Sequence, residues 1–378
     1  MGDFEFNDMQ QMLRDTLARF FEDRYGFEGR RQLLASDAFH LPAVWASLAQ
    51  ELGVLGASFP EEAGGLGGGA VDRMVVMEEI GRALVIEPYL STAVLGGGVL
   101  SRAGGQAAAD LVTGVIDGSV LIAFAHDEPA STLDQPAIAT TARADGDGFV
   151  LDGVKRLVLD APVATHLIVS ATGADGHLLL FVVPVGTAGI TRTDCRMIGG
   201  MGAAEIALDA VHVPAAARLD TGGDANALVA QVQDEGVAAL CAEAVGILER
   251  LVADTVDYTK QRRQFGKAIA EFQVLQHMMV DMHVAAQEAK AITLTATLSL
   301  DAPAEERAAM VSAAKVRIGR ACRSVSQVAV QLHGGMGMTD ELAIGHLFRR
   351  ALMIETQFGS TEEHRRRFER LVLDRAAA

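Results

Sequence analysis

The chain has 378 residues, of which 50% are hydrophobic, 21% charged and 5% aromatic. This balance is typical of a globular protein rather than a disordered one, and the length predicts two or three domains. The formal net charge of −17 argues against a nucleic-acid partner and against binding to an anionic membrane, although backbone amides can still bind phosphate.

Residues 1–118 are predicted to form an N-terminal helical domain. The first helix, in FNDMQQMLRDTLARFFEDRYG, carries its apolar side chains at helical spacing, at Met9, Leu13, Leu17 and Phe20. LPAVWASLAQELGVLG has Pro42 near a helix start and ends on glycine, and VDRMVVMEEIGRAL repeats the helical pattern. Between them, EEAGGLGGGA has the composition of a phosphate cradle. Because no P-loop Lys-Ser/Thr follows, we expect a flexible connector instead.

Residues 119–226 are predicted to form a middle β domain. Short runs rich in Val, Ile, Leu and Thr follow one another, in SVLIAFAHDEP, AIATTARADGDGFVLDGVKRLVL, THLIVSAT, GHLLLFVVPV and AEIALDAVHVP. Turn signals such as DGDG, GADG and TAG separate these runs. The spacing of the turns favours a β-sandwich or barrel.

Residues 227–378 return to the helical period and predict a C-terminal domain like a four-helix bundle. One apolar stripe comprises Leu240, Ala244, Ile247 and Leu251, and another comprises Phe272, Leu275, His277 to Met279, and Met282. AAMVSAAKVRIGRACRSVSQVAVQLHGG predicts a long helix of small residues that lets its neighbours approach closely. The predicted fold class is therefore α+β and multidomain, in the order α, β, α.

The cysteines and the N-terminus indicate the compartment. Cys195, Cys241 and Cys322 are widely spaced and form no CxxC pair, which predicts neither a disulfide framework nor a zinc site. The segment MGDFEFNDMQQMLRD is acidic and amphipathic, unlike a signal or transit peptide. No apolar run reaches the length of a bilayer span. We expect a soluble cytoplasmic protein with no membrane partner.

Two motifs of the third domain carry candidate ligand contacts. In RRQFGKAI, two guanidinium groups beside Phe265 could pair with a diphosphate and stack on the ring. The alternative is a basic helix end followed by a glycine cap. In QLHGGMGM, three glycines allow a ligand to approach the backbone closely, although a helix end and turn have the same composition.

Taken together, these motifs resemble the acyl-CoA dehydrogenase family. The resemblance is carried by RRQFGKAIAEFQVLQH, by QLHGGMGM some sixty residues later, by IAFAHDEPA and FVLDGVKRLVL, and by the α-β-α order. It covers essentially the whole chain. DRYGFEGRRQLL, RALVIEPYLSTAVLGGGVL and AALCAEAVG resemble the small subunit of bacterial pimeloyl-CoA dehydrogenase, a two-component member.

The resemblance implies FAD, α,β-desaturation of an acyl-CoA thioester in fatty or dicarboxylic acid degradation, and an electron-transfer flavoprotein or similar acceptor. It also implies a tetramer of one or two chain types. Arg262, Phe265 and Gln273 would contact the ADP half of FAD, whose flavin ring lies on a neighbouring subunit. Gln331 and Gly335 would line the same groove, and Ser360 would replace a threonine near the flavin.

Three positions depart from the family near the flavin ring. Asp127, in HDEP, stands where the family offers a hydroxyl group to the ring. A carboxylate there would disfavour the anionic reduced flavin. Leu157 and Leu159, in RLVL, stand where the family has an aromatic residue and a threonine. They supply bulk but no hydrogen bond.

Both positions that hold the catalytic glutamate in this family lack a carboxylate. Counted without gaps from GGMG, the usual position falls at Phe358, and the alternative position on the earlier helix falls at Gly236, with Val237 replacing the usual arginine. The family's glutamate removes the α-proton while hydride leaves the β-carbon for the flavin. Phenylalanine cannot accept a proton.

Several residues are candidates for a displaced base. Glu235 is the first, although one helical step turns its side chain about 100° away from Gly236. The others are Glu243, Glu362, Glu363, His333 and His364. Helix-start acids, an ion pair and local hydrogen bonds are their more ordinary roles.

We therefore expect the subunit without a catalytic base of a heteromeric acyl-CoA dehydrogenase, whose paralogous large subunit supplies the glutamate. One alternative is a self-sufficient flavoenzyme with a displaced base. The other is a binding or scaffold protein of the same fold, because a fold does not determine a function.

Overall fold

The computed structural model describes residues 6–133 and 137–377. The chain forms two compact units, and each combines segments that are distant in the sequence. The first comprises Met1–Arg31, Ala70–Val85 and Val237–Ala378, and the second comprises Gln32–Gly69 and Ile86–Gly236. Because the N-terminal helices are shared between the units, the three predicted domain boundaries stay a prediction.

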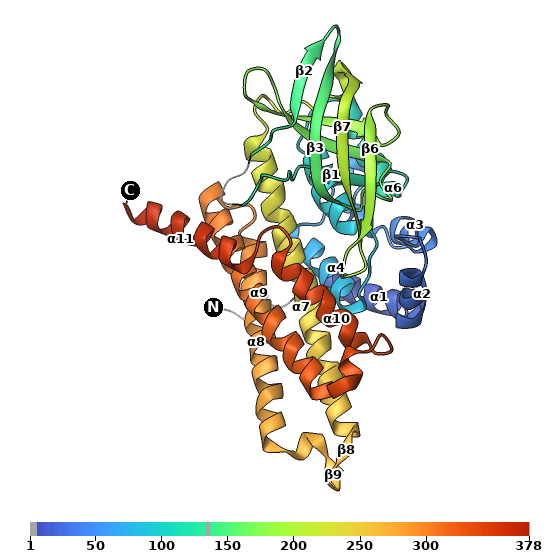
Figure 1. The fold of residues 1–378 in the computed structure, drawn as a ribbon, viewed down its shortest axis with the longest axis vertical. Helices are drawn as coiled ribbons and strands as arrows, with labels where there is room; N and C mark the ends of the chain where they lie inside the picture. Colours follow the sequence, from blue (N-terminus) through green and yellow to red (C-terminus); the bar gives the residue numbers. More distant parts are fainter. Residues whose placement is uncertain (1–5, 134–136, 378) are drawn as a thin grey trace. The chain divides into compact units, whose positions relative to one another are not determined.

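The first unit is helical. Its helices are α1 (Asp8–Arg24), α4 (Ala70–Ala83), most of α7 (Asn226–Gln261), α8 (Gln273–Leu298), α9 (Ala304–His333), α10 (Ala343–Thr356) and α11 (Thr361–Ala377). Helix α9 packs against α8, α10 and α11, as Figure 1 shows for α8. The stripe predicted on α7 is confirmed, because Leu240, Ala244, Ile247 and Leu251 are fully buried. None of the described helices is long and apolar enough to cross a membrane.

Helix α1 begins at an Asn7–Gln10 capping box, in which each side chain bonds the other residue's backbone N–H. Leu17 and Phe20 of its predicted stripe are buried. Met9 is 68% exposed, so the stripe begins later than predicted. The buried face of the helix packs on α4.

Helices α4 and α7 touch backbone to backbone at two glycines. A Cβ atom on Gly81 would lie 1.9 Å from the backbone oxygen of Glu243, and one on Gly246 would lie 1.9 Å from that of Glu78. Only glycine permits this approach at either position. The contact holds the backbone of Glu78 firmly against α7.

The second unit contains shorter helices and the β domain. Its helices are the end of α2 (Phe27–Ala35), α3 (Pro42–Gln50), a π-helix (Leu90–Gly96), α5 (Gly97–Leu100), α6 (Gln106–Asp117) and the start of α7. Pro42 occupies the first turn of α3, as predicted. The glycine-rich segment after α3 is ordered. Its amides donate to carbonyls of residues 56–61, from Gly64, Gly65, Leu66, Gly67 and Gly68. The expected flexibility is therefore wrong, and these amides are not free to bind phosphate.

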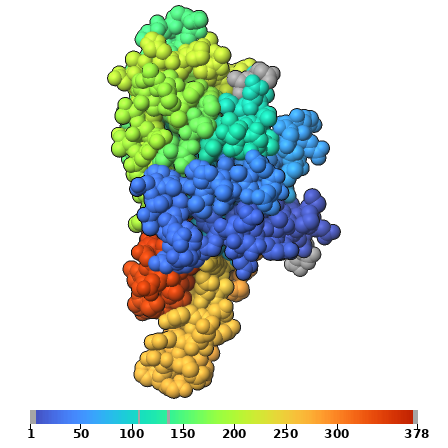
Figure 2. Space-filling model, turned by 90° about the vertical axis from the view of Figure 1, so that its right-hand side faces the viewer, coloured from blue at the N-terminus to red at the C-terminus, as the bar shows by residue number. Residues whose placement is uncertain are grey.

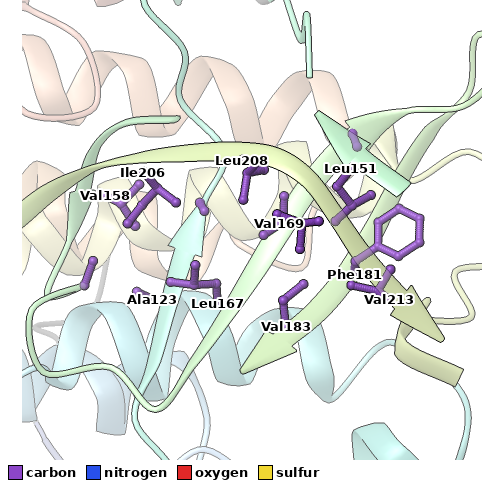
Figure 3. Packing of buried hydrophobic residues seen from close by; sticks show 14 of the residues in the cluster. Ala123, Leu151, Val158, Leu167, Val169, Phe181, Val183, Ile206, Leu208 and Val213 are labelled. Carbon is purple, nitrogen blue, oxygen red and sulfur yellow. The ribbon is translucent and has the colours of Figure 1, made fainter. Parts of the chain in front are cut away.

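The described strands of the β domain form one seven-stranded sheet in the order β1-β4-β2-β3-β7-β6, with β5 beside β4. They are β1 (Ile122–Ala125), β2 (Thr141–Asp145), β3 (Gly148–Leu159), β4 (His166–Thr172), β5 (Leu178–Pro184), β6 (Ile190–Arg196) and β7 (Gly202–Pro214). Alternate side chains pack into one core, which includes Leu151, Leu167, Phe181 and Ile206 (Figure 3). Strand β6 is not predicted from the sequence, because its ITRTDCR side chains are mostly exposed.

Candidate functional site

The first candidate motif forms an exposed arm of the helical unit. Helix α7 ends at Gln261, and the chain then makes a hairpin from β8 (Arg263–Gln264) and β9 (Lys267–Ala268) before α8. The arm lies at the tip of this unit, in the yellow-orange segment of Figure 2. Phe265, in the turn, is 93% exposed and has a φ of +53°. An exposed aromatic ring on a strained turn is typical of a residue that contacts a ligand or another chain.

The arm carries Arg262 and Phe265, and Gln273 begins the helix that follows it. The ring of Phe265 lies 6.2 Å from that of Phe272, which also carries the Lys267 ammonium 4.3 Å from its centroid. Arg262 and Gln273 are exposed, and within the described residues their side chains make no hydrogen bond or ion pair. The arm therefore presents guanidinium and amide donors beside an apolar ring.

The second motif lies beside the root of this arm. Tyr258, one helical turn before Arg262, stacks on His333 at 4.2 Å between ring centroids. Helix α9 ends at His333, and Gly334 reverses the chain with a φ of +60°. A Cβ atom on Gly335 would meet nothing within 4 Å, and Gln331 is exposed. The backbone at Gly335 is therefore open to a ligand.

The side chain of His333 forms a hydrogen bond within its own helix. Its Nδ1 atom lies 2.8 Å from the carbonyl oxygen of Ala329. Burial lowers the pKa of the imidazole, and the hydrogen bond to Ala329 opposes that effect. A neutral ring that is hydrogen bonded in its own helix is poorly placed to act as a base.

The β domain places Asp127 next to Leu157. The backbone N–H of Arg156 donates to the carbonyl oxygen of Asp127 at 2.8 Å, at an irregularity where β3 shifts register. Leu157 is 49% exposed there and has a φ of +47°. Leu159, in contrast, is only 9% exposed and paired with β7. It can offer little surface to a ligand.

The Asp127 carboxylate is exposed, and it makes no hydrogen bond within the part of the chain that the structure describes. Desolvation by the surrounding protein raises the pKa of this carboxyl, and the charges of Lys155 and Arg156 oppose the rise. It is thus a solvent-reachable carboxylate whose proton is held more tightly than usual.

A buried ion pair, which sequence reasoning missed, fixes the residues on both sides of Asp127. Lys155 is fully buried, and its Nζ atom lies 2.6 Å from Oε1 of Glu128. The Ser170 hydroxyl lies 3.1 Å from the same Nζ and 3.0 Å from Nδ1 of His126. Thr140 and Ala139 also donate to Glu128. Lysine at an inward position of β3 is the sequence signal that could have revealed this network.

Phe358, the position that the resemblance assigns to the catalytic residue, lies on the turn between α10 and α11. Phe358 has a φ of +57° and Gly359 one of +103°. Buried Lys315 donates to the carbonyl oxygens of Glu355, at 3.1 Å, and Gly359, at 2.7 Å. Nε2 of His364 lies 2.9 Å from the carbonyl oxygen of Phe358. The strained turn is therefore held by two buried side chains.

The candidate acids next to this turn are already engaged. Ser360 donates from its amide, at 2.9 Å, and from its hydroxyl, at 2.7 Å, to Glu363, which closes a capping box on α11. Glu362 pairs with Arg365, which lowers the pKa of that carboxyl. Neither acid is free to take a substrate proton.

The remaining candidates are also engaged. Glu243, buried in α7, accepts two hydrogen bonds from the Arg350 guanidinium, at 2.5 and 2.6 Å. Glu235, buried in the start of α7, pairs with Arg102 at 2.5 Å. Gly236, beside it, is also buried. To accept a substrate proton, either carboxylate would first have to give up its hydrogen bond to arginine.

Several of the positions predicted from the sequence have strained backbone. Six described residues other than glycine have positive φ, namely Leu84, Leu157, Asp160, Ala210, Phe265 and Phe358. Three of them, Leu157, Phe265 and Phe358, are positions that the sequence motifs selected. Such conformations are unfavourable by roughly 1–3 kcal/mol each and concentrate at functional sites.

The fold and these elements are those of acyl-CoA dehydrogenases. Residues 7–110, 123–211 and 227–373 match, respectively, the N-terminal, middle and C-terminal domains of that family. The chain belongs to the acyl-CoA dehydrogenase family, whose enzymes are FAD-dependent oxidoreductases acting on the CH–CH bond of an acyl-CoA.

Individual relatives agree over the whole length. Probable acyl-CoA dehydrogenase YngJ of Bacillus subtilis (strain 168) is 30% identical, over 98% of each chain. Butyryl-CoA dehydrogenase from Megasphaera elsdenii is 25% identical, with a TM-score of 0.88, over 98% of this chain and 100% of that one. The Tcur3481-Tcur3483 steroid ACAD is 28% identical, with a TM-score of 0.89, over 98% of this chain and 99% of that one.

The donor set of the helical unit fits FAD. A diphosphate needs positively charged donors and free backbone amides, and an adenine ring needs a flat apolar surface. The donors for a diphosphate are present in Arg262, in Gln273 and in the open backbone at Gly335. The flat apolar surface for the adenine ring is the side chain of Phe265. When FAD is bound, these groups would hold its ADP half.

Proposed function

We propose that this chain is the subunit without a catalytic base in a cytoplasmic, heteromeric acyl-CoA dehydrogenase. A paralogous large subunit supplies the catalytic glutamate, as expected from the resemblance to the small subunit of pimeloyl-CoA dehydrogenase. The observation that carries the proposal is Phe358, which occupies the tip of the turn between α10 and α11.

The turn at Phe358 keeps its shape although it has no base. Lys315 and His364 bond the carbonyl oxygens of Glu355, Phe358 and Gly359, and none of these bonds uses the side chain at position 358. A protein can therefore lose the glutamate here without losing the fold. Such a loss is harmless where another subunit performs the proton transfer.

The engaged state of the other acids supports the same proposal. Glu235, Glu243, Glu362 and Glu363 each bond an arginine or the Ser360 cap. To act as a base, any of them would first have to break that bond. For the buried residues Glu235 and Glu243, removing the arginine partner costs about 3–5 kcal/mol, so we expect a displaced base at neither of them.

The chain contributes cofactor binding instead. FAD, when bound, accepts the hydride that leaves the β-carbon of the acyl group. Arg262 and Gln273 would hold the ADP half of a FAD whose ring lies on the neighbouring subunit, and Phe265 would stack on it. The exposure of this arm supports a contact outside its own chain. The reduced cofactor would pass its electrons to an electron-transfer flavoprotein or similar acceptor.

A relative supports the assembly. The Tcur3481-Tcur3483 steroid ACAD, 28% identical to this chain, carries two component names. We propose the same kind of two-component enzyme for this chain, with an acyl-CoA thioester as its substrate.

Asp127 supports a second candidate function, a self-sufficient flavoenzyme with a displaced base. Among the site acids considered, Asp127 alone has a carboxylate without a hydrogen bond to the described chain. Its raised pKa makes this carboxylate a stronger base than an ordinary aspartate. In this case the chain would act without a partner, and Asp127→Asn would abolish its activity.

Co-expression separates the two candidates. The chain would be tagged and produced together with any acyl-CoA dehydrogenase paralogue that a neighbouring gene encodes. We expect a stable complex with dehydrogenase activity, and a glutamate-to-glutamine change in the paralogue should abolish that activity. Full activity of this chain alone, lost in Asp127→Asn, would establish the second candidate instead.

A further inference from the structure

A cleft in the helical unit lies among α1, α4 and α8. Its volume is about 460 Å³, within the range of small-molecule sites. It is lined by Phe6, Gln11, Arg14, Met74, Glu78, Lys290 and Leu294. None of these residues belongs to the exposed arm between α7 and α8, to the turn at Phe358 or to the β domain. The inference therefore does not depend on the proposed function.

Glu78 is the unusual member of this lining. Its side chain is only 2% exposed, and it makes no hydrogen bond or ion pair within the described residues. Buried carboxyl groups are normally bonded, because leaving one unpaired costs free energy. The backbone of Glu78 is held against Gly246 of α7. An unpartnered carboxyl group therefore faces the cleft.

The other charges at the cleft are positive. Arg14 lies over the ring of Phe6, at 5.5 Å from its centroid, and Lys290 bonds Glu249 at 2.8 Å. Both side chains are partly exposed. Phe6, Met74 and Leu294 add an apolar wall. The lining thus combines two cations, one unpaired carboxyl group and a surface for a hydrocarbon.

We propose that this cleft binds a small amphipathic carboxylate. Its head would accept hydrogen bonds from Arg14 and Lys290 and from the protonated Glu78 carboxyl, and its hydrocarbon part would pack against Phe6, Met74 and Leu294. An acid and a carboxylate that share one proton form a short, strong hydrogen bond. An amine would be repelled by the two cations, and inorganic phosphate has no hydrocarbon part to pack against the apolar wall.

The protonation of Glu78 makes this binding pH-dependent. Burial raises the pKa of Glu78 to about 7; Lys290 and Arg82 oppose the rise, and Glu249 and Glu79 add to it. The basic side chains around it are Arg14, Arg82 and Lys290. Burial raises the pKa of Glu79, and for Glu249 the hydrogen bonds and charges of Lys290 and Arg82 outweigh burial and lower the pKa. Because only protonated Glu78 donates, affinity should fall about tenfold between pH 6 and pH 8.

Calorimetric titration of the full chain with hexanoate tests the proposal, with hexylamine and inorganic phosphate as comparators. We expect saturable hexanoate binding at pH 6, one site per chain, and neither comparator to compete. Glu78→Gln should remove the tenfold pH effect. Glu79→Gln, the neighbouring buried acid, should leave that effect in place, and the exposed Glu28→Gln should change nothing.

A second variant keeps the test independent of the charges. Leu294→Trp fills the cleft and should abolish hexanoate binding while the melting temperature stays near that of the parent. Absence of saturable hexanoate binding at pH 6 would overturn the proposal. Hexanoate binding that survives Leu294→Trp unchanged, or competition by hexylamine or phosphate, would overturn it too.

Discussion

The Nε2 atom of His364 lies 2.9 Å from the backbone oxygen of Phe358. A carbonyl oxygen can only accept, so the imidazole carries its proton on Nε2 and donates it to the turn. Lys315 bonds the next carbonyl oxygen, that of Gly359, at 2.7 Å. The backbone at position 358 is thus kept in place, while the phenylalanine side chain has no group that could accept a proton.

Phe358→Glu should create or raise dehydrogenase activity. The new carboxylate would stand on a turn whose backbone is already held by Lys315 and His364, so the substitution needs no rearrangement. Acyl-CoA-dependent reduction of the flavin measures the effect, and Phe358→Gln is the control of equal shape without a base. Equal activity of the two variants in flavin-loaded protein would show that position 358 does not face the substrate.

Arg262→Ala should weaken FAD retention. The change removes a charge-assisted phosphate contact, and such contacts contribute roughly 1.5–3 kcal/mol. The ratio of bound flavin to protein after gel filtration measures the loss. Arg143→Ala, on the exposed face of β2, is the matched control and should retain flavin. Equal occupancy in Arg262→Ala and the parent would remove Arg262 from the site.

Lys155→Met should destabilise the β domain by about 3–5 kcal/mol, because it leaves the Glu128 carboxylate buried without its cation. Urea unfolding monitored by circular dichroism measures the change. Lys155→Met combined with Glu128→Gln should cost less than the sum of the two single changes. Additive costs would show that the two side chains do not act as a pair.

Glu78→Gln should change how stability depends on pH. Burial raises the pKa of Glu78 from 4.5 to about 7, so between these values the folded chain holds a proton that the unfolded chain has released. The free energy of unfolding should therefore fall as pH rises through this window, and Glu78→Gln should flatten that part of the fall. Melting temperatures at pH 4.5, 6 and 8 measure it. Parallel curves for variant and parent would show that Glu78 titrates normally.

Much of the fold could be predicted because the spacing of apolar residues along the chain indicates which side chains are buried. The stripe from Leu240 to Leu251 lies fully buried in α7. Strand β6 escaped because an exposed edge strand has no apolar alternation to recognise. The π-helix from Leu90 to Gly96 escaped because its hydrogen-bond pattern has no sequence signature of its own.

The sequence indicated which positions belong to the candidate site, but it did not indicate which residues bond to the candidate bases. Short motifs such as RRQFG and QLHGGMGM identify Arg262 and Gly335 because the contributing residues are close in sequence. The partners that occupy the candidate bases are not local, since Arg102 lies 133 residues from Glu235 and Arg350 lies 107 from Glu243. Only the fold brings such residues together.

The most direct test is an anaerobic visible spectrum of the chain purified alone, titrated with medium-chain and dicarboxylyl-CoA thioesters. If the catalytic base resides on a partner, flavin will be absent, or present but still oxidised at saturating thioester. Bleaching of the flavin by any of these thioesters would contradict this, because it would mean that a base of this chain removes the α-proton.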